Sequence, residues 1–150
     1  MRKETLTFED YNGKEHTEDF YFYLTEMELT EYQTEWEGGI QAVLRKIQLS
    51  QDSKLTVEMM KKLITISYGE RVDNRFEKFD KEGNRLVYKN FFSTGADSAL
   101  FMKMLTGDGH EISDFIHDVL PKKLTEEIEK EQKENKPAAV VPGPGAPANK

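Results

Sequence analysis

The feature that most constrains the fold is a pair of short alternating segments on either side of Asn12-Gly13. Residues 6–10 alternate apolar and polar side chains before this dipeptide, and residues 18–24 carry large apolar side chains at every second position after it. A period of two is typical of a half-buried strand. Asn and Gly both tolerate the positive φ that a type I′ turn needs. We therefore predict an N-terminal β-hairpin over residues 4–24.

The second strand of this hairpin has aromatic residues on both faces. Phe20, Phe22 and Leu24 fall on one face, whereas Tyr21 and Tyr23 fall on the other. Either helices cover both sides, or one face remains for a partner.

The period changes to that of a helix from residue 25 onward. Thr25 with Glu28 predicts a capping box at the first helix start. Gly38-Gly39 predicts a break or kink, because each Gly costs about 1 kcal/mol relative to Ala inside a helix. The apolar stripe around this break consists of Trp36, Ile40, Val43, Leu44 and Ile47.

Three further segments follow with helical or irregular patterns. A helix is predicted by the apolar stripe of Leu55, Met59, Leu63 and Ile66. Asp52 or Ser53 is its N-cap candidate. The helix should end near Tyr68-Gly69, where Gly supplies the C-cap. Residues 71–89 are polar and show no long period, with a short strand expected at 76–79 and a turn at 80–84. A second capping box at Thr94 to Asp97 predicts a helix that ends at Gly107, and residues 112–119 predict a last helix before Pro121.

The fold class is therefore α+β, with an N-terminal β-hairpin followed by a mainly α-helical domain. We expect one compact domain over residues 1–121, made of the hairpin (4–24) and a helical region (25–121). A charged, helical extension is expected over 122–136. Residues 137–150 are rich in Pro, Ala and Gly, and we expect a disordered tail there.

Charge and cysteine content exclude several classes of function. The 150 residues carry a net charge of −7, which argues against nucleic-acid binding, because phosphate contacts need clustered Lys and Arg. There is no cysteine, so disulfides and zinc–thiolate sites are excluded. No apolar run is long enough for a membrane span, and the N-terminal residues lack the apolar core of a signal peptide. We expect a protein of the cytoplasm without membrane or nucleic-acid partners.

Catalytic and metal-binding patterns are weak. His110, Asp114 and His117 share one helical face, a spacing that could serve a metal but is more often a solvated surface. Nucleotide-binding, hydrolase and metalloprotease motifs do not occur. We expect no enzyme activity, no cofactor and no metal.

Adaptable apolar side chains instead favour a binding protein. Met59, Met60, Met102 and Met104 fall in two amphipathic helices. Methionine fills cores, but it is also frequent on surfaces that accept varied apolar partners.

Six short segments follow one another in a characteristic order: DYNG (10–13), FYFYLTEMEL (20–29), ISYGER (66–71), RFEK (75–78), FSTGADSALF (92–101) and FIHDVLP (115–121). This order of motifs resembles the tail assembly chaperones of siphophages, especially those of Gram-positive hosts. The resemblance covers residues 6–121.

This resemblance implies a role in building a phage tail. Such chaperones bind the long tape measure protein, keep its apolar helical segments soluble and assist polymerisation of the tail tube. The tail tube protein is a second expected partner, and self-association is left open. We expect the chain in the host cytoplasm and not in the mature virion. A longer form made by ribosomal frameshifting, near the Lys-rich residues 129–136, is implied as well.

Two groups of residues are candidates for function. On the resemblance and the apolar pattern, we expect Tyr21, Tyr23, Phe101 and Met102 to bind the partner. The family-motif residues are Tyr68, Gly69, Arg71, Phe76 and Lys78. The main alternative is a structural subunit of the virion, in the tail tube or the head–tail connector. A small enzyme or metal protein is a third.

Overall fold

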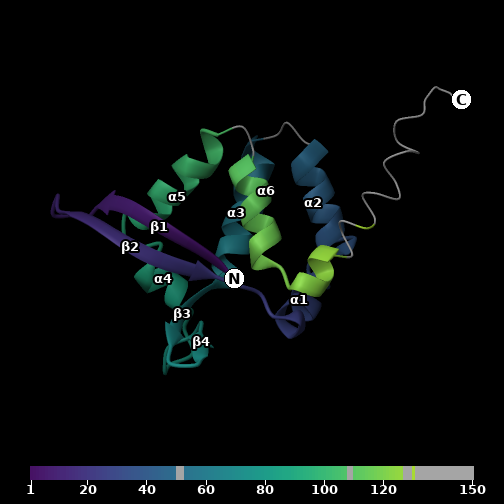
Figure 1. Ribbon diagram of the computed structural model, residues 1–150, viewed down its shortest axis with the longest axis horizontal. Helices are drawn as coiled ribbons and strands as arrows, with labels where there is room; N and C mark the ends of the chain where they lie inside the picture. The colour runs from purple at the N-terminus through teal and green to yellow at the C-terminus, as the bar shows by residue number, and fades with distance from the viewer. Residues whose placement is uncertain (50–52, 108–109, 127–129, 131–150) are drawn as a thin grey trace, which may run out of the picture. The chain divides into compact units, whose positions relative to one another are not determined.

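The computed structural model describes residues 1–49, 53–107, 110–126 and 130. Residues Met1–Leu120 form one compact unit, and a second unit begins at Pro121. The first unit is α+β, with an antiparallel hairpin followed by helices, as the sequence predicts (Figure 1). In the second unit residues 122–126 are helical. The rest of the predicted extension, apart from residue 130, and the predicted tail over 137–150 lie outside the described residues.

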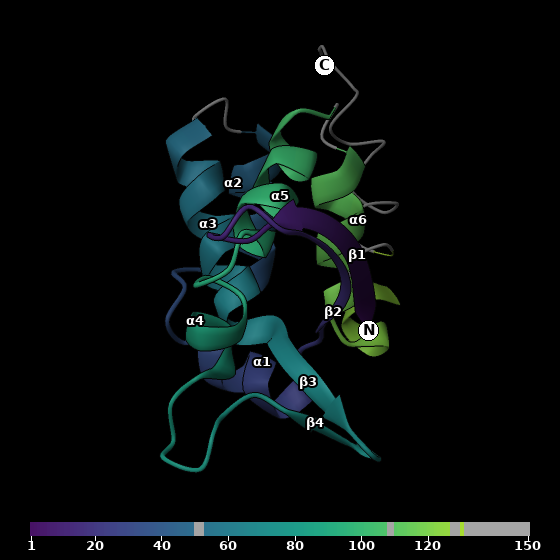
Figure 2. The ribbon, with the colours of Figure 1, turned by 90° about the vertical axis from the view of Figure 1, so that its left-hand side faces the viewer.

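The sheet contains four antiparallel strands in the order β1-β2-β3-β4. Their bounds are Arg2–Glu9 for β1, Glu15–Phe22 for β2, Tyr68–Val72 for β3 and Arg75–Glu77 for β4. The hairpin β1-β2 is paired over its whole length, whereas β3 pairs with β2 only through its first two residues, Tyr68 and Gly69. Figure 2 shows β3 and β4 as a short arm beyond β2. The strand β3 lies where the sequence predicted a helix end.

The hairpin turn differs from the predicted type I′ turn. Among the described residues other than glycine, only Asp73 has a positive φ, so Asn12 does not, while Gly13 has a φ of 83°. The Asp10 side chain explains the difference, because its Oδ1 accepts from the backbone N–H groups of Asn12 and Lys14, both at 2.9 Å. This bonding closes the chain with one left-handed residue instead of two. The predicted turn at 80–84 is confirmed and uses the same bonds around Asp80.

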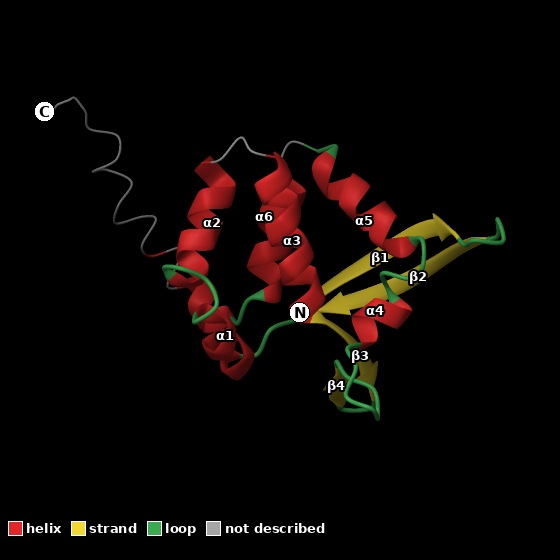
Figure 3. Cartoon of the chain, turned by 180° about the vertical axis from the view of Figure 1, so that it is seen from behind, coloured by secondary structure: helices red, strands yellow, loops and turns green. Residues whose placement is uncertain are grey.

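In the described part of the first unit, six helices follow or flank the strands. They are α1 (Glu26–Gln33), α2 (Gly39–Leu49), α3 (Ser53–Ser67), α4 (Leu86–Asn90), α5 (Ala96–Leu105) and α6 (His110–Val119). Within the first unit, α5 packs against β1 and α6, and α2 packs against α3 (Figures 1 and 3). The short α4 was missed from the sequence, because five residues are too few to show a helical period.

The hairpin turns towards these helices the face on which the sequence placed Phe20, Phe22 and Leu24. Phe20, Phe22 and Leu24 are buried, and the rings of Phe91 and Phe115 meet the Phe22 ring edge-on at 5.7 and 5.1 Å between centroids. Aromatic rings prefer this edge-to-face contact because their edges and faces carry opposite partial charge. The core therefore lies between the sheet and α3, α4, α5 and α6, and α3 contributes Met60, Leu63, Ile64 and Ile66.

The first helical stretch is divided where the sequence indicated. Thr25 forms the capping box with Glu28, which confirms the predicted start of α1. The chain leaves the helix after Gln33 and re-enters it at Gly39, so Gly38-Gly39 marks a true break. Trp36 lies in the turn between the two helices. The other side chains of the predicted stripe, Ile40, Val43, Leu44 and Ile47, lie outside the described part.

The end of α3 corrects the predicted glycine C-cap. Gly69 belongs to β3, and the last carbonyls of α3 are satisfied from distant parts of the chain. Tyr23 N–H donates to the Ser67 carbonyl at 2.8 Å, and Lys78 Nζ donates to the Ile66 carbonyl at 2.9 Å. These carbonyls have no partner inside the helix, and a cation at a helix C-terminus also interacts favourably with the helix dipole. The helix can thus pass directly into a strand.

The second predicted capping box is also wrong. The N-cap of α5 is Gly95, which has no side chain to cap with. A Cβ at this position would lie 2.5 Å from the carbonyl oxygen of Glu9, so α5 can approach β1 this closely only with glycine. Thr94 instead accepts from the Ala96 N–H at 3.1 Å. The last helix, α6, ends at Val119 before Pro121, as predicted.

Candidate functional site

Helix α5 exposes apolar side chains on the side that faces away from the sheet. Its inner face buries Ala96, Leu100 and Met104. On its outer face Met102 is 56% exposed and Leu105 is 44% exposed. Phe101, which lies next to Leu105 around the helix, is half-buried. We call Phe101, Met102 and Leu105 the α5 face.

The α5 face stands out among exposed apolar side chains. The others are Met1, Tyr11, Met27, Leu49, Phe79 and Tyr88. Each of these lies on a different element or turn, and single exposed apolar residues are normal. Among the side chains that the structure describes, α5 is the helix that exposes two large apolar residues.

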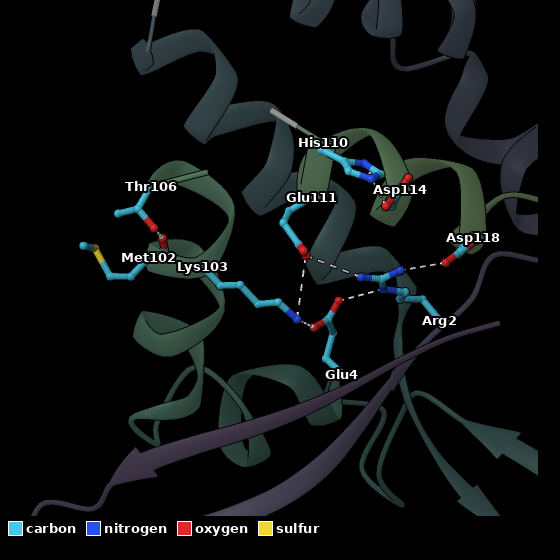
Figure 4. Close-up of polar contacts among 9 residues, drawn as sticks. All are labelled: Arg2, Glu4, Met102, Lys103, Thr106, His110, Glu111, Asp114 and Asp118. Atoms are coloured by element: carbon cyan, nitrogen blue, oxygen red, sulfur yellow. Dashed lines mark hydrogen bonds and ion pairs between the residues drawn. The ribbon is translucent and has the colours of Figure 1, made fainter. Parts of the chain in front are cut away.

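An ion-pair cluster holds α5 and α6 on β1 (Figure 4). At its centre is the Glu4 carboxylate, which is 2% exposed. Lys103 Nζ of α5 lies 2.8 Å from Glu4 Oε1, and Arg2 Nε lies 2.7 Å from Glu4 Oε2. Arg2 also reaches Asp118 of α6 at 2.8 Å, and Glu111 of α6 lies 3.7 Å from both cations.

This cluster fixes the orientation of α5. Lys103 points into the cluster, whereas Met102 points away from it (Figure 4). A buried carboxylate needs such partners because an unpaired charge in the interior is costly. The cluster therefore keeps the α5 face directed to solvent.

Sequence reasoning missed both Glu4 and Leu105. Glu4 has the same strand parity as Leu6 and Phe8, and that parity indicates an inward-facing position. Leu105 lies three and four residues after Met102 and Phe101, so helical spacing groups all three.

Tyr21 and Tyr23 do not join the α5 face. Glu4 pairs with Phe20 in the register, so the face of the hairpin that carries Phe20 is the one that α5 covers. Tyr21 points to the opposite face, where the Arg71 guanidinium lies 5.3 Å from its ring centroid. The four predicted partner-binding residues therefore do not form one surface: Phe101 and Met102 share α5, and Tyr21 lies on the other side of the sheet.

Lys78 is buried where three segments meet. Its Nζ donates to the carbonyl of Tyr23 at 2.6 Å and to that of Ile66 at 2.9 Å, and it lies 2.8 Å from Glu28 Oε2. Burial lowers the pKa of Lys78, and the Glu28 carboxylate only partly offsets this. Partial burial by itself raises the pKa of Glu28, but its hydrogen bonds with Lys78 and with the Thr25 backbone hold it below its usual range.

Two of the other four family-motif residues, Tyr68 and Gly69, are also buried. The ring of Tyr68 packs among Phe20, Phe22 and Phe91, and its hydroxyl donates to Glu70 at 2.9 Å. Burial, reinforced by the Glu70 carboxylate, raises the pKa of Tyr68.

Gly69 is required by the contact across the β3-β4 arm. A Cβ there would lie 2.5 Å from the ring of Phe76. Of the five motif residues, Arg71 is the exposed one. The family-motif residues Tyr68, Gly69, Phe76 and Lys78 thus make contacts that join the hairpin, α3 and the β3-β4 arm.

The described residues offer little for metal chemistry. His110 Nδ1 lies 3.0 Å from Asp114 on the surface of α6. Within residues 1–49, 53–107, 110–126 and 130, no three His, Asp or Glu side chains are placed to hold a metal ion. In the same part of the chain, no helix has the length and apolarity to cross a bilayer.

Fold and surface together define a small α+β protein with an apolar helix face directed to solvent. The family model described as phage tail assembly chaperone matches residues 1–147, and the chain belongs to that family. No curated protein and no solved structure matches it. Its general role is thus in phage tail assembly, with tail proteins as its partners, and its family is one of assembly factors rather than catalysts.

Proposed function

We propose that this protein binds the tape measure protein of its phage through the α5 face, keeps it soluble and assists polymerisation of the tail tube around it. The proposal places this work in the host cytoplasm and the chaperone outside the finished virion. The observation that carries it is the exposed α5 face on a folded, acidic body. A long helical protein with apolar stripes needs such a surface until its own partners cover those stripes.

Co-expression with the tape measure protein tests this function. The soluble yield of the tape measure is measured with and without the chaperone, and the complex is isolated through a tag on the chaperone. A soluble tape measure that co-purifies is the expected result. An insoluble tape measure beside a folded, soluble chaperone contradicts the proposal.

Surface variants then identify the side of the sheet that binds. Replacing Met102 and Leu105 together with Ser removes most of the exposed apolar area of α5, so capture should fall strongly. Replacing Tyr21 and Tyr23 with Ser should have a smaller effect, because Tyr21 lies on the opposite face of the hairpin. Tyr88→Ser, at an exposed position on α4, is the matched control. Circular dichroism checks that each variant is folded.

A further inference from the structure

The strand β2 is paired with β1 over its whole length, but with β3 only at its end. In an antiparallel sheet, alternate residues direct their N–H and C=O groups to opposite neighbouring strands. The Asp10 N–H donates to the Lys14 carbonyl at 2.8 Å, so the even-numbered residues of β2 bond to β1. The Tyr23 N–H donates to the Ser67 carbonyl at 2.8 Å, so the odd-numbered residues point to the side of β3.

Three odd-numbered residues of β2 have no strand beside them. The strand β3 pairs with Tyr21 and Phe22 and then turns away into the arm with β4 (Figure 2). Within the described part of the chain, no backbone group bonds on this side to the N–H and C=O groups of Glu15, Thr17 and Asp19. We call these groups the β2 edge.

The β2 edge is open to solvent. Thr17, Glu18 and Asp19 are consecutive and all exposed, and successive side chains point to opposite faces of a sheet, so no helix covers either face here. Figure 1 shows the turn of the hairpin projecting past α4 and α5. The other edge of the hairpin is less accessible, because Gly95 at the start of α5 lies close to the Glu9 carbonyl oxygen. An open edge with unpaired N–H and C=O groups can accept a further strand.

The end of the hairpin that carries the β2 edge is strongly acidic. Residues 9–19 contain five carboxylates and one lysine, a net charge of −4 within a chain of −7. The side chains of Glu18 and Asp19 are 53% and 44% exposed. Lys3 Nζ, 3.9 Å from Asp19, offsets only part of this charge. On an added strand, a positive side chain opposite these carboxylates is therefore favoured, and a negative one is opposed.

We propose that the β2 edge binds a basic, extended segment of another protein as an added strand. The segment pairs with β2 where β3 has turned away, and its Lys or Arg side chains lie opposite Glu15, Glu18 and Asp19. The inference goes beyond the proposed function, because it gives the chaperone a second contact surface, for an extended chain instead of a helix.

The described strands of a second copy are poorer occupants of this edge. Pairing two β2 edges would bring their carboxylates together, and like charges would oppose it. The free edge of β1 is obstructed at Glu9, and β4 is three residues long. A basic segment of another protein meets neither obstacle.

Three short synthetic peptides test the inference with the full chain. The Lys peptide alternates Lys with Thr, and the Glu peptide has Glu in place of each Lys. The third is the Lys peptide with methyl groups on its central backbone nitrogens, so it keeps the charge but cannot donate hydrogen bonds. Fluorescence anisotropy measures affinity, and hydrogen exchange followed by NMR measures protection of each amide proton of the chaperone.

Strand addition predicts a specific pattern of protection. At saturation, the Lys peptide should slow exchange of the Thr17 and Asp19 amide protons about tenfold or more, because they become hydrogen-bonded. The Glu peptide should bind about tenfold more weakly. The methylated peptide should also bind about tenfold more weakly and give no protection, because it lacks the donors.

Variants of the chaperone locate the binding. Thr17→Pro removes an N–H of the β2 edge that the hairpin does not use, and should weaken the Lys peptide about tenfold. Thr17→Val keeps this N–H and is the matched control, since both changes lose the bond to the Thr7 hydroxyl at 2.9 Å. Asp19→Lys should reduce the preference for Lys over Glu, whereas Glu82→Lys, in the turn at 80–84, should leave it unchanged. Circular dichroism checks folding, and the methylated peptide tests the same bonds without altering the chaperone.

Each contrary outcome overturns the inference. Equal affinity for the Lys and Glu peptides, or binding of neither, excludes a basic segment. Equal binding of the methylated peptide excludes strand addition, and full binding by a folded Thr17→Pro variant excludes the β2 edge. Protection of the Thr17 and Asp19 amides that rises with chaperone concentration, without peptide, would show that a second copy is the occupant.

Discussion

Replacing Lys78 with Met removes a buried ammonium while it keeps a side chain of similar length. The wild-type residue is 7% exposed, so water cannot easily replace the lost bonds. The carbonyls of Ile66, in the last turn of α3, and of Tyr23 lose their donor, which lies at 2.9 and 2.6 Å. The Glu28 carboxylate, whose side chain is 24% exposed, loses its charged partner at 2.8 Å.

The expected loss of stability follows from these two defects. A buried acceptor left without a donor costs about 1–3 kcal/mol. Removing one partner of a buried ion pair costs about 3–5 kcal/mol, and the partial exposure of Glu28 places this pair at the lower end. The two terms share one side chain, so they do not simply add. We expect a total loss of about 3–4 kcal/mol, a large part of the roughly 5–15 kcal/mol that folds a typical domain.

Urea unfolding, followed by far-UV circular dichroism and by Trp36 fluorescence, measures this loss. Lys81→Met, at an exposed turn position, is the control and should change stability by less than about 0.5 kcal/mol. Adding Glu28→Gln to Lys78→Met should recover about 1–2 kcal/mol, because it removes the uncompensated charge. A loss below about 1 kcal/mol for Lys78→Met, with no recovery in the double variant, would refute the assignment of Lys78 as the group that joins α1, α3 and the hairpin.

Three further predictions concern the same framework. Gly69→Ala should lower the free energy of unfolding by about 1–3 kcal/mol, because the new Cβ would lie 2.5 Å from the Phe76 ring. Urea unfolding measures this loss. Adding Phe76→Ala to the same chain should relieve part of the clash. Glu4→Gln should lower the free energy of unfolding by about 2–3 kcal/mol, because the amide NH₂ would face Lys103 or Arg2 in place of an acceptor. Glu9→Gln, at an exposed position of the same strand, is the control. An equal loss for both changes would contradict a special role for Glu4. The pKa of Glu28 is lowered in the folded state, so its contribution is present above the unfolded pKa of about 4.3 and is lost as pH falls through the folded value. The stability difference between wild type and Glu28→Gln should therefore shrink as the pH is lowered from 6 to about 3 in urea titrations, and a constant difference would contradict the shift.

The sequence predicted best the features that depend on near neighbours. The hairpin with its inward Phe20 and Phe22, the capping box at Thr25 and the break at Gly38-Gly39 all arise from residues within a few positions of one another. Strand and helix periods are local properties, so a single sequence displays them. Two local predictions failed for a reason outside their own segment. Gly69 is a close contact with Phe76 rather than a helix cap, and the N-cap of α5 is a glycine that allows contact with β1.

The sequence by itself determined the fold class and which side chains of the hairpin share a face, and it led to the hypothesis that the α5 segment contributes to partner binding. Only the tertiary structure decided which apolar residues share a surface. It separated Tyr21 from Met102 and added Leu105 to the α5 face. It also brought Glu4 to Lys103, 99 positions away, and Glu28 to Lys78, 50 positions away. Such contacts join segments that no local period connects, and burial gives these charges their effect by removing the water that would otherwise screen them.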